Sequence, residues 1–195
     1  EIMPSLVGSE MCIRDSSRPK DFYQTEYDVS SWDAIPVPSS WNIYGIQKDG
    51  SQKYGTPIYV NQPVIFQHSV KVDDWRGGVM RTPPANWTTY KDRNEVGSFR
   101  RDFEIPQDWD GREVFISFDG VDSFFYLWIN GQYVGFSKNS RNTANFNITP
   151  YLQKGKNTVA AEVYRSSDGS FLEAQDMFRL PGIFLSLIHI SEPTR

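Results

Sequence analysis

The stretch from Phe118 to Ser137, FDGVDSFFYLWINGQYVGFS, decides the fold of this chain. Asn130-Gly131 is a strong signal for a two-residue hairpin, because a type I′ turn needs a positive φ at both central positions. A strand with one face in water should alternate in polarity. The run before the turn is instead apolar in both alternating registers, Phe124, Tyr126 and Trp128 in one and Phe125, Leu127 and Ile129 in the other. We therefore predict a central strand that is buried on both faces.

A two-residue turn also fixes the register of the hairpin. The expected pairs are Ile129 with Gln132, Trp128 with Tyr133, Leu127 with Val134, and Phe125 with Phe136. Aromatic and β-branched pairs of this kind contribute roughly 0.2–1 kcal/mol each. The apolar run is far shorter than the ~20 residues of a membrane-spanning helix, so no membrane partner is predicted.

Other short strands are expected at intervals of about 8–12 residues, without a long helical pattern between them. They are predicted at 55–63 as an edge strand, weakly at 66–72, and then at 96–105, 114–118, 144–148 and 158–165. One helical turn is expected within 150–157, a long loop at 73–94, and an anchoring role in the core for Trp41. This pattern predicts the all-β class, as an antiparallel sandwich or jelly roll.

Length and charge limit the remaining possibilities. The 195 residues suffice for one sizeable domain, and the aromatic content of 15% favours a β-rich one. The net charge is −4 and there is no run rich in Lys or Arg, so we predict no nucleic-acid partner. With a single cysteine, Cys12, the chain forms no intrachain disulfide.

The two ends of the chain are related through their codons. Residues 6–16 are LVGSEMCIRDS and residues 185–195 are LSLIHISEPTR. A DNA segment that encodes the second has a reverse complement that encodes Leu6–Asp15 and the start of a Ser codon. Two genuine but unusual tails remain the alternative, but an inverted match this long is typical of a sequencing adaptor translated on both strands. The interpretation is that the chain is a fragment of a longer gene, cut at both sides by the read.

The domain boundaries follow from this interpretation. We predict a non-native tail at 1–16, derived from the adaptor at 6–16, a β-sandwich domain at 17–184, and an adaptor-derived tail at 185–195. Outside the tails the chain has one histidine, His68, and no cysteine. Neither a His/Cys metal site nor a nucleophile–base pair is therefore predicted.

The segment 166–184, SSDGSFLEAQDMFRLPGIF, is where chemistry is expected. It combines charged and aromatic residues, namely Asp168, Glu173, Asp176, Arg179, Phe171 and Phe178. A carboxylate beside aromatic rings suits a sugar, since charge-assisted hydrogen bonds to hydroxyls contribute about 1.5–3 kcal/mol and a ring can cover the apolar sugar face. Two other interpretations stay open. Asp168-Gly169 can be only a β-turn, and two of the carboxylates can form the acid and nucleophile of a glycosidase.

A series of short motifs occurs in a characteristic order between Pro19 and Phe184. They are Pro38-Ser39-Ser40-Trp41, Tyr54-Gly55-Thr56-Pro57-Ile58-Tyr59-Val60-Asn61, Gly97-Ser98-Phe99-Arg100, Phe118-Asp119-Gly120-Val121-Asp122-Ser123, Trp128-Ile129-Asn130-Gly131, Val134-Gly135-Phe136-Ser137, Ser140-Arg141 and the segment 167–184. Together they resemble the amino-terminal sugar-binding domain of the bacterial β-galactosidases of glycoside hydrolase family 2. The motif that ends in Gly182-Ile183-Phe184 is the most specific of them.

The resemblance implies a jelly-roll β-sandwich of the galactose-binding-domain type, followed by an immunoglobulin-like domain and a TIM barrel. The barrel would hold the acid and nucleophile glutamates of a retaining mechanism, so this chain would carry no catalytic residue and would not be active alone. Asn61 and Asp168 would bind the galactoside substrate. Asp168 would also ligate a sodium ion, a hard cation that oxygen ligands suit. Magnesium would belong to the parent enzyme, without ligands in this fragment.

The resemblance implies partners as well: the missing downstream domains of the same chain and, for the parent enzyme, further copies in a homo-oligomer. The compartment stays open between cytoplasm and periplasm. Two departures from the family pattern matter. Gln62-Pro63 follows Asn61 where the family has an aromatic-proline pair, and the family's opening strand is missing, which predicts an unfilled sheet edge and marginal stability.

Two other functions are alternatives to a β-galactosidase domain. The first is a stand-alone carbohydrate-binding module without hydrolytic activity. It would need a self-contained, aromatic-lined groove at Asp168, whereas a fragment of an enzyme would present Asp168 at one end of the sandwich without a pocket of its own. The second, a β-mannosidase or β-glucuronidase relative, is disfavoured by the Ser-Asp-Gly-Ser and Gln-Asp-Met motifs at 167–170 and 175–177.

Overall fold

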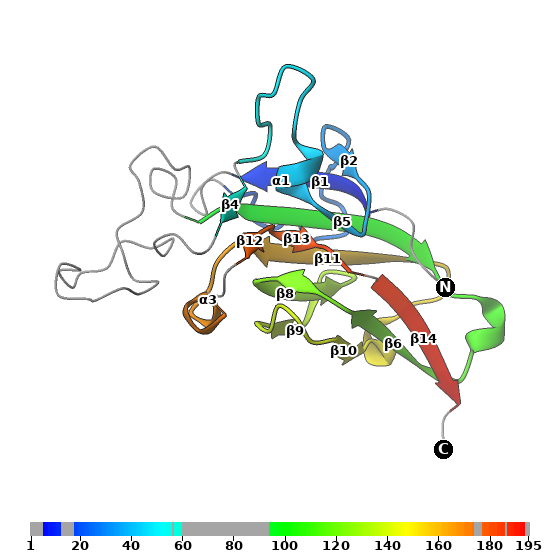
Figure 1. The fold of residues 1–195 in the computed structure, drawn as a ribbon. Coiled ribbons are helices and arrows are strands. Elements are labelled where there is room, and N and C mark those ends of the chain that lie inside the picture. Colours follow the sequence, from blue (N-terminus) through cyan, green and yellow to red (C-terminus); the bar gives the residue numbers. More distant parts are fainter. Residues whose placement is uncertain are drawn as a thin grey trace.

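The chain folds as an all-β sandwich with the jelly-roll architecture that the sequence predicts (Figure 1). The structure is a computed structural model and describes residues 6–12, 18–55, 57–59, 94–173, 177–185 and 187–193. The strands are β1 Leu6–Cys12, β2 Asp33–Ile35, β3 Ser39–Ser40, β4 Ile58–Tyr59, β5 Val96–Glu104, β6 Arg112–Phe118, β7 Val121–Asp122, β8 Phe124–Ile129, β9 Gln132–Ser137, β10 Ala144–Asn147, β11 Lys156–Tyr164, β12 Phe178–Arg179, β13 Gly182–Ile183 and β14 Leu187–Pro193. The helical elements are single turns, α1 Trp41–Tyr44, α3 Gly169–Leu172, η3 Gln107–Trp109 and η4 Thr149–Tyr151.

Antiparallel pairing organises the strands into two layers. The larger sheet has the order β2-β1-β5-β11-β8-β9, and the smaller sheets have the orders β10-β6-β14 and β3-β13-β7. The two longest strands, β5 and β11, pair along their whole length, from Lys156 opposite Glu104 to Tyr164 opposite Val96. The strands expected at 96–105, 114–118, 144–148 and 158–165 are confirmed, and the helical turn expected within 150–157 is η4.

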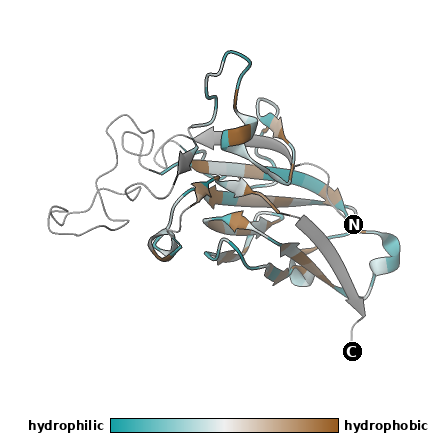
Figure 2. Ribbon diagram, in the orientation of Figure 1, coloured by the Kyte–Doolittle hydropathy of each residue, from teal (hydrophilic) through white to brown (hydrophobic). Residues whose placement is uncertain are grey.

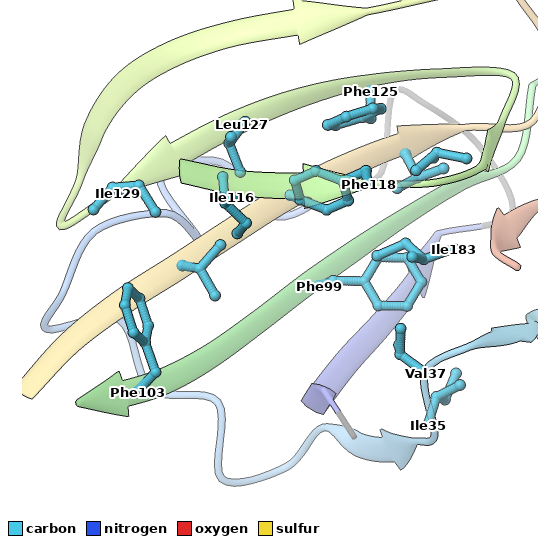
Figure 3. Close-up of a cluster of buried hydrophobic side chains, with 14 of the residues drawn as sticks. Ile35, Val37, Phe99, Phe103, Ile116, Phe118, Phe125, Leu127, Ile129 and Ile183 are labelled. Atoms are coloured by element: carbon cyan, nitrogen blue, oxygen red, sulfur yellow. The ribbon is translucent and has the colours of Figure 1, made fainter. Parts of the chain in front are cut away.

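The hydrophobic core fills the space between the layers (Figure 3). Phe99 on β5 and Leu127 on β8 meet Ile116 on β6 there, and all three are buried. Trp41 is fully buried in the same cluster, which confirms its anchoring role. Figure 2 shows the matching hydropathy, with hydrophobic segments along the strands and a hydrophilic loop after α1.

The β8–β9 hairpin confirms the turn and half of the predicted register. Asn130 has φ 50° and Gly131 has φ 78°, as a type I′ turn requires. The pairs of Ile129 with Gln132 and Trp128 with Tyr133 are confirmed. Beyond them the prediction is wrong, because an irregularity between Leu127 and Trp128 inserts one extra residue into β9. The pairs after this bulge are Leu127 with Gly135, Tyr126 with Phe136, and Phe125 with Ser137.

Only one face of β8 is fully buried. The strand lies between β11 and β9, and Phe125, Leu127 and Ile129 face the core. The alternating side chains Phe124, Tyr126 and Trp128 are half-buried, so the prediction of burial on both faces is correct for one of them only. Aromatic side chains can serve such a face because each has an apolar body and Tyr and Trp also carry a polar group.

The sheet edge that was expected to be unfilled is occupied. β1 pairs with β5 through residues 9–12, and β14 pairs with β6 along residues 187–193. The expectation of an unfilled edge is therefore wrong where β1 pairs with β5, because the unpaired backbone groups of an edge strand can accept any extended segment. The pairing of the tails does not test where their DNA came from. Their assignment to a sequencing adaptor therefore stays a prediction. The edge strand expected at 55–63 is described only in part, as β4, and the predictions for 66–72 and most of 73–94 lie outside the described residues.

The core position of Leu127 gives a direct test of this fold. We expect Leu127→Ala to lower the free energy of unfolding by about 2–5 kcal/mol, because a fully buried side chain leaves a cavity. Urea denaturation followed by circular dichroism measures the change. Gln132→Ala, at an exposed position of β9, is the control and should stay within about 0.5 kcal/mol of the unchanged chain. Equal losses in both variants would contradict the placement of β8.

Candidate functional site

Asp168 lies in water at one end of the sandwich. It follows β11 by four residues and precedes α3, which lies at the same end as β4 and β12 (Figure 1). Its Oδ1 accepts a hydrogen bond of 2.9 Å from the Gly169 amide, so the side chain caps this single helical turn. The side chain is nevertheless 75% exposed. Asp168 therefore has the turn role that the sequence allows, and its second oxygen points away from the core.

Lys138 forms an exposed ion pair with Asp168 and lowers the pKa of its carboxyl group. The Lys138 ammonium donates a hydrogen bond of 3.0 Å to Asp168 Oδ2. This bond is the main reason why the pKa of Asp168 lies below its usual value, and the Gly169 amide adds to the effect. Both side chains are exposed, so the pair adds little to stability. Its consequence is electrostatic: Asp168 is an ionised hydrogen-bond acceptor that a ligand from solvent can reach.

A buried ion pair fixes the start of the loop that carries Asp168. Arg165 directly follows β11, and its guanidinium lies 2.6 Å from Glu95 Oε1, with both side chains at most 2% exposed. Trp41 and Asn42 donate to the other oxygen of Glu95, at 3.5 and 3.3 Å. Two hydrogen bonds between the Asn94 side chain and the Ser166 backbone, of 2.7 and 3.0 Å, continue this attachment.

A second buried guanidinium fixes the other end of the loop. Arg179 on β12 is 2% exposed and lies 3.7 Å from both Asp122 Oδ1 and Glu173 Oε2. It also donates to the carbonyl oxygens of Ser170 and Glu173, within and after α3. Burial raises the pKa of Asp122, and the charge of Arg179 opposes this shift. The loop between Arg165 and Arg179 is thus attached to the sandwich at both of its ends.

Two hollows lie at this end of the molecule. One, of about 410 Å³, is lined by Lys138, Asn139, Asp168, Gly169, Leu172 and Glu173, and the side chain of the neighbouring Phe171 lies outside the described part of the chain. The other, of about 430 Å³, is lined by Ser39, Ser40, Ile43, Tyr44, Asp122, Arg141, Phe178, Leu180 and Phe184. In the second hollow the Arg141 guanidinium lies over the ring of Phe184, 5.0 Å from its centroid.

The other residues that the sequence singled out have varied positions. Asn61, His68 and Asp176 lie outside the described residues. Both carboxylate oxygens of Glu173 accept hydrogen bonds from Ser140, from its amide at 3.0 Å and its hydroxyl at 2.5 Å. Glu173 therefore holds the loop in place. These contacts do not support a role for Glu173 as the acid or the nucleophile of a glycosidase.

Sequence reasoning missed most of the supporting residues. It assigned no role to Lys138, Glu95, Arg165 or Asp122. The available signal was weak: Glu95 and Arg165 are charged residues at the borders of two apolar strands, and the antiparallel pairing of β5 with β11 brings those borders together. Only that pairing distinguishes a buried ion pair from two solvated charges.

A sodium ion is not accounted for by the described residues alone. They contain no group of three His, Cys, Asp or Glu side chains arranged to hold a metal. Asp168 offers one carboxylate, and the Lys138 ammonium at 3.0 Å competes with a cation for it. Of Asp168 and Lys138, only Asp168 could therefore be a ligand of such a site. Within the described ranges, no helix is long and apolar enough to cross a membrane.

Comparison with known proteins covers nearly the whole chain. The family model described as "Glycosyl hydrolases family 2, sugar binding domain" matches residues 11–193. The β-galactosidase of Priestia megaterium is 40% identical over 176 residues, which are 90% of this chain and 15% of that protein. The β-galactosidase of Halalkalibacterium halodurans is 40% identical over 172 residues, with 88% and 15% covered. The β-galactosidase large subunit of Leuconostoc lactis is 33% identical, with 91% of this chain and 27% of the subunit covered.

Solved structures support the same fold. A crystal structure of Bacteroides uniformis β-glucuronidase superposes with a TM-score of 0.63 at 19% identity, over 99% of this chain and 18% of that one. A β-glycosidase from Bacteroides vulgatus gives a TM-score of 0.58 at 24% identity, over 98% and 20%. At such identities the likeness concerns the fold alone. The chain spans about 15% of the length of the first two β-galactosidases above.

The buried pair of Glu95 and Arg165 predicts a large stability effect. Glu95→Gln should lower the free energy of unfolding by about 3 kcal/mol or more, because it removes the carboxylate that directly contacts the buried Arg165 guanidinium. The new amide would also face the donors of Trp41 and Asn42. Chemical denaturation measures the loss, and failure to fold would agree with it. Lys138→Gln is the control. It removes only an exposed ion pair, so the midpoint of denaturation should stay unchanged.

The hydrogen bond from Lys138 predicts a shift in titration. Lys138→Gln should raise the pKa of Asp168 toward the ordinary value of an aspartate, because the main cause of its lowering is removed. A pH titration of the side-chain carboxyl carbon by NMR measures this. Lys156→Gln, which breaks an ion pair with Asp102 instead, should leave Asp168 unaffected. An unchanged Asp168 pKa in Lys138→Gln would contradict the pair seen in the structure.

Proposed function

The chain belongs to the sugar-binding domain of glycosyl hydrolases family 2, and on this premise we propose that it is the amino-terminal domain of a β-galactosidase. In this proposal the parent enzyme hydrolyses terminal β-D-galactosides with retention, and its two glutamates lie in a downstream barrel. The sandwich contributes no reacting group. Its part is to present Asp168, and with it Asn61, to the sugar in a site that the downstream domains complete.

The observation that carries the proposal is the placement of Asp168. It is an ionised carboxylate, exposed at one end of the sandwich, on a loop that Arg165 and Arg179 attach at both ends. A carboxylate held in this way accepts hydrogen bonds from sugar hydroxyls without a large loss of loop entropy on binding. Its energetic role would be to orient the galactosyl ring, so that the barrel acts on the glycosidic bond.

The hollow at Asp168 favours an enzyme domain over a self-contained binding module. Its described lining offers polar groups and the exposed Leu172, and the hollow is open to solvent rather than enclosed by the loop that carries Asp168. A partner surface would have to close the site, and relatives several times longer than this chain are consistent with such a surface. Sodium remains part of the proposal only as an ion that Asp168 would help to ligate, and a homo-oligomeric parent remains an expectation.

The proposal is tested in a complete enzyme. Residues 17–184 replace the corresponding domain of the full-length Priestia megaterium β-galactosidase, and hydrolysis of a nitrophenyl β-galactoside is followed. We expect the chimera to be active and Asp168→Asn to lower kcat/KM by roughly 10- to 150-fold, the equivalent of one charge-assisted hydrogen bond. Asn61→Ala should lower it as well.

The matched control is Asp110→Asn. This aspartate is also exposed but follows η3, beyond the opposite end of β5, so its loss should leave kcat/KM unchanged. The proposal fails if Asp168→Asn matches this control in an active chimera, or if a folded chimera has no activity. Hydrolysis of the same substrate by the 195-residue chain alone would contradict it too.

A further inference from the structure

A third hollow, with a different chemistry, lies on the outer face of the six-stranded sheet. It has a volume of about 490 Å³ and lies between the segment 18–23 and the strands β8, β9 and β11. Its walls include the rings of Tyr23, Tyr126, Trp128, Tyr133 and Tyr164. These side chains of β8 point away from the core, which takes the alternate residues of that strand. We call this hollow the aromatic groove.

Arg100 on β5 holds one wall of the aromatic groove in place. Its buried guanidinium donates to three backbone carbonyls of the segment 22–27, those of Phe22, Thr25 and Tyr27. Tyr23 is thereby placed flat on Trp128, with ring centroids 5.0 Å apart and an interplanar angle of 8°. The groove is therefore a preformed feature of the described fold, since its wall is attached to the sheet that forms its floor.

The polar groups of the groove are few and well placed. Glu162 on β11, 8% exposed, lies 3.3 Å from the Arg18 guanidinium and accepts a hydrogen bond of 2.5 Å from the Tyr164 hydroxyl. Within the described part of the chain, the hydroxyls of Tyr126 and Tyr133 have no hydrogen-bond partner. Tyr133 is 51% exposed, so both its ring and its hydroxyl can be reached from solvent.

We propose that the aromatic groove is a second carbohydrate-binding site, one that takes a short oligosaccharide. The exposed ring of Tyr133 would cover the apolar face of one hexose, as aromatic rings do for C–H-rich surfaces. The hydroxyls of Tyr126 and Tyr133 and the rim of the Glu162–Arg18 pair would bind sugar hydroxyls. This site is independent of the galactoside site at Asp168 and does not rest on the function proposed for it.

The lining favours a sugar over a protein segment. Its described residues include no Leu, Ile, Val or Met, which a docked apolar peptide would contact. The Glu162–Arg18 pair in the groove offers charged groups that sugar hydroxyls can bind. The volume falls in the range of about 300–1,000 Å³ that is usual for small-ligand sites.

The experiment is a titration of the 195-residue chain with β-1,4-galactotetraose and, separately, with lactose. Of the six tryptophans, Trp128 is the one that lines the groove in the described part of the chain, so intrinsic fluorescence follows binding, and backbone amide shifts of β8 and β9 localise the signal to the groove. We expect saturable binding of the tetraose that Tyr133→Ala weakens about tenfold, the loss of roughly one stacked ring. Gln132→Ala, the exposed neighbour, should bind as the unchanged chain does.

Asp168→Asn separates the two sites. If the groove binds the sugar, this variant keeps the fluorescence change and the shifts in β8 and β9. The inference fails if a folded chain shows no saturable change with either sugar, or if Tyr133→Ala binds as tightly as the unchanged chain. Loss of the signal in Asp168→Asn would overturn it as well, because binding would then belong to the loop after β11. A dimer by light scattering that the tetraose leaves intact, without saturable sugar binding, would assign the groove to a second copy instead.

Discussion

The ion pair between Glu95 and Arg165 is the constraint on which the candidate site depends. It lies where β5 begins and β11 ends, so it joins the two longest strands at the point where the chain leaves the sheet toward Asp168. Burial of two charges is costly, and hydrogen bonds to the charged groups offset part of that cost. Trp41 and Asn42 supply two of them. A buried ion pair, with its cost in desolvation, thus lies next to the loop that positions Asp168 for the proposed function.

The sequence predicted the strands well and the supporting contacts poorly. Turn chemistry at Asn130-Gly131 and alternation along the later strands are local properties, and these predictions are confirmed. The bulge in β9 has only a weak local signal, because the isolated Gly135 can mark a bulge but does not fix the register. The buried guanidiniums of Arg165 and Arg179 are long-range features as well. A charge beside an apolar strand is usually solvated, and only the tertiary pairing shows otherwise.

The placement of the two ends shows why strand pairing is weak evidence for origin. Residues 6–12 pair with both β2 and β5, and residues 187–193 pair with β6 at a sheet edge, although we predict that both segments derive from one adaptor. A β-ladder needs only an extended backbone, and its hydrogen bonds are the same for every residue except proline. The sandwich edge next to β5 therefore specifies that a strand should pair there, but not the sequence of that strand.

The hairpin of β8 and β9 connects the two faces of the large sheet. Its inward residues, such as Leu127, build the core that holds β11 and hence the Asp168 loop, while its outward rings form the aromatic groove. The same alternation that places Leu127 inside places Trp128 outside, since successive side chains of a strand point to opposite faces. A rigid hairpin can therefore present rings to a ligand without any change in the core. The two proposed sites share a scaffold but no residue of their linings, so a substitution in one lining leaves the residues of the other unchanged.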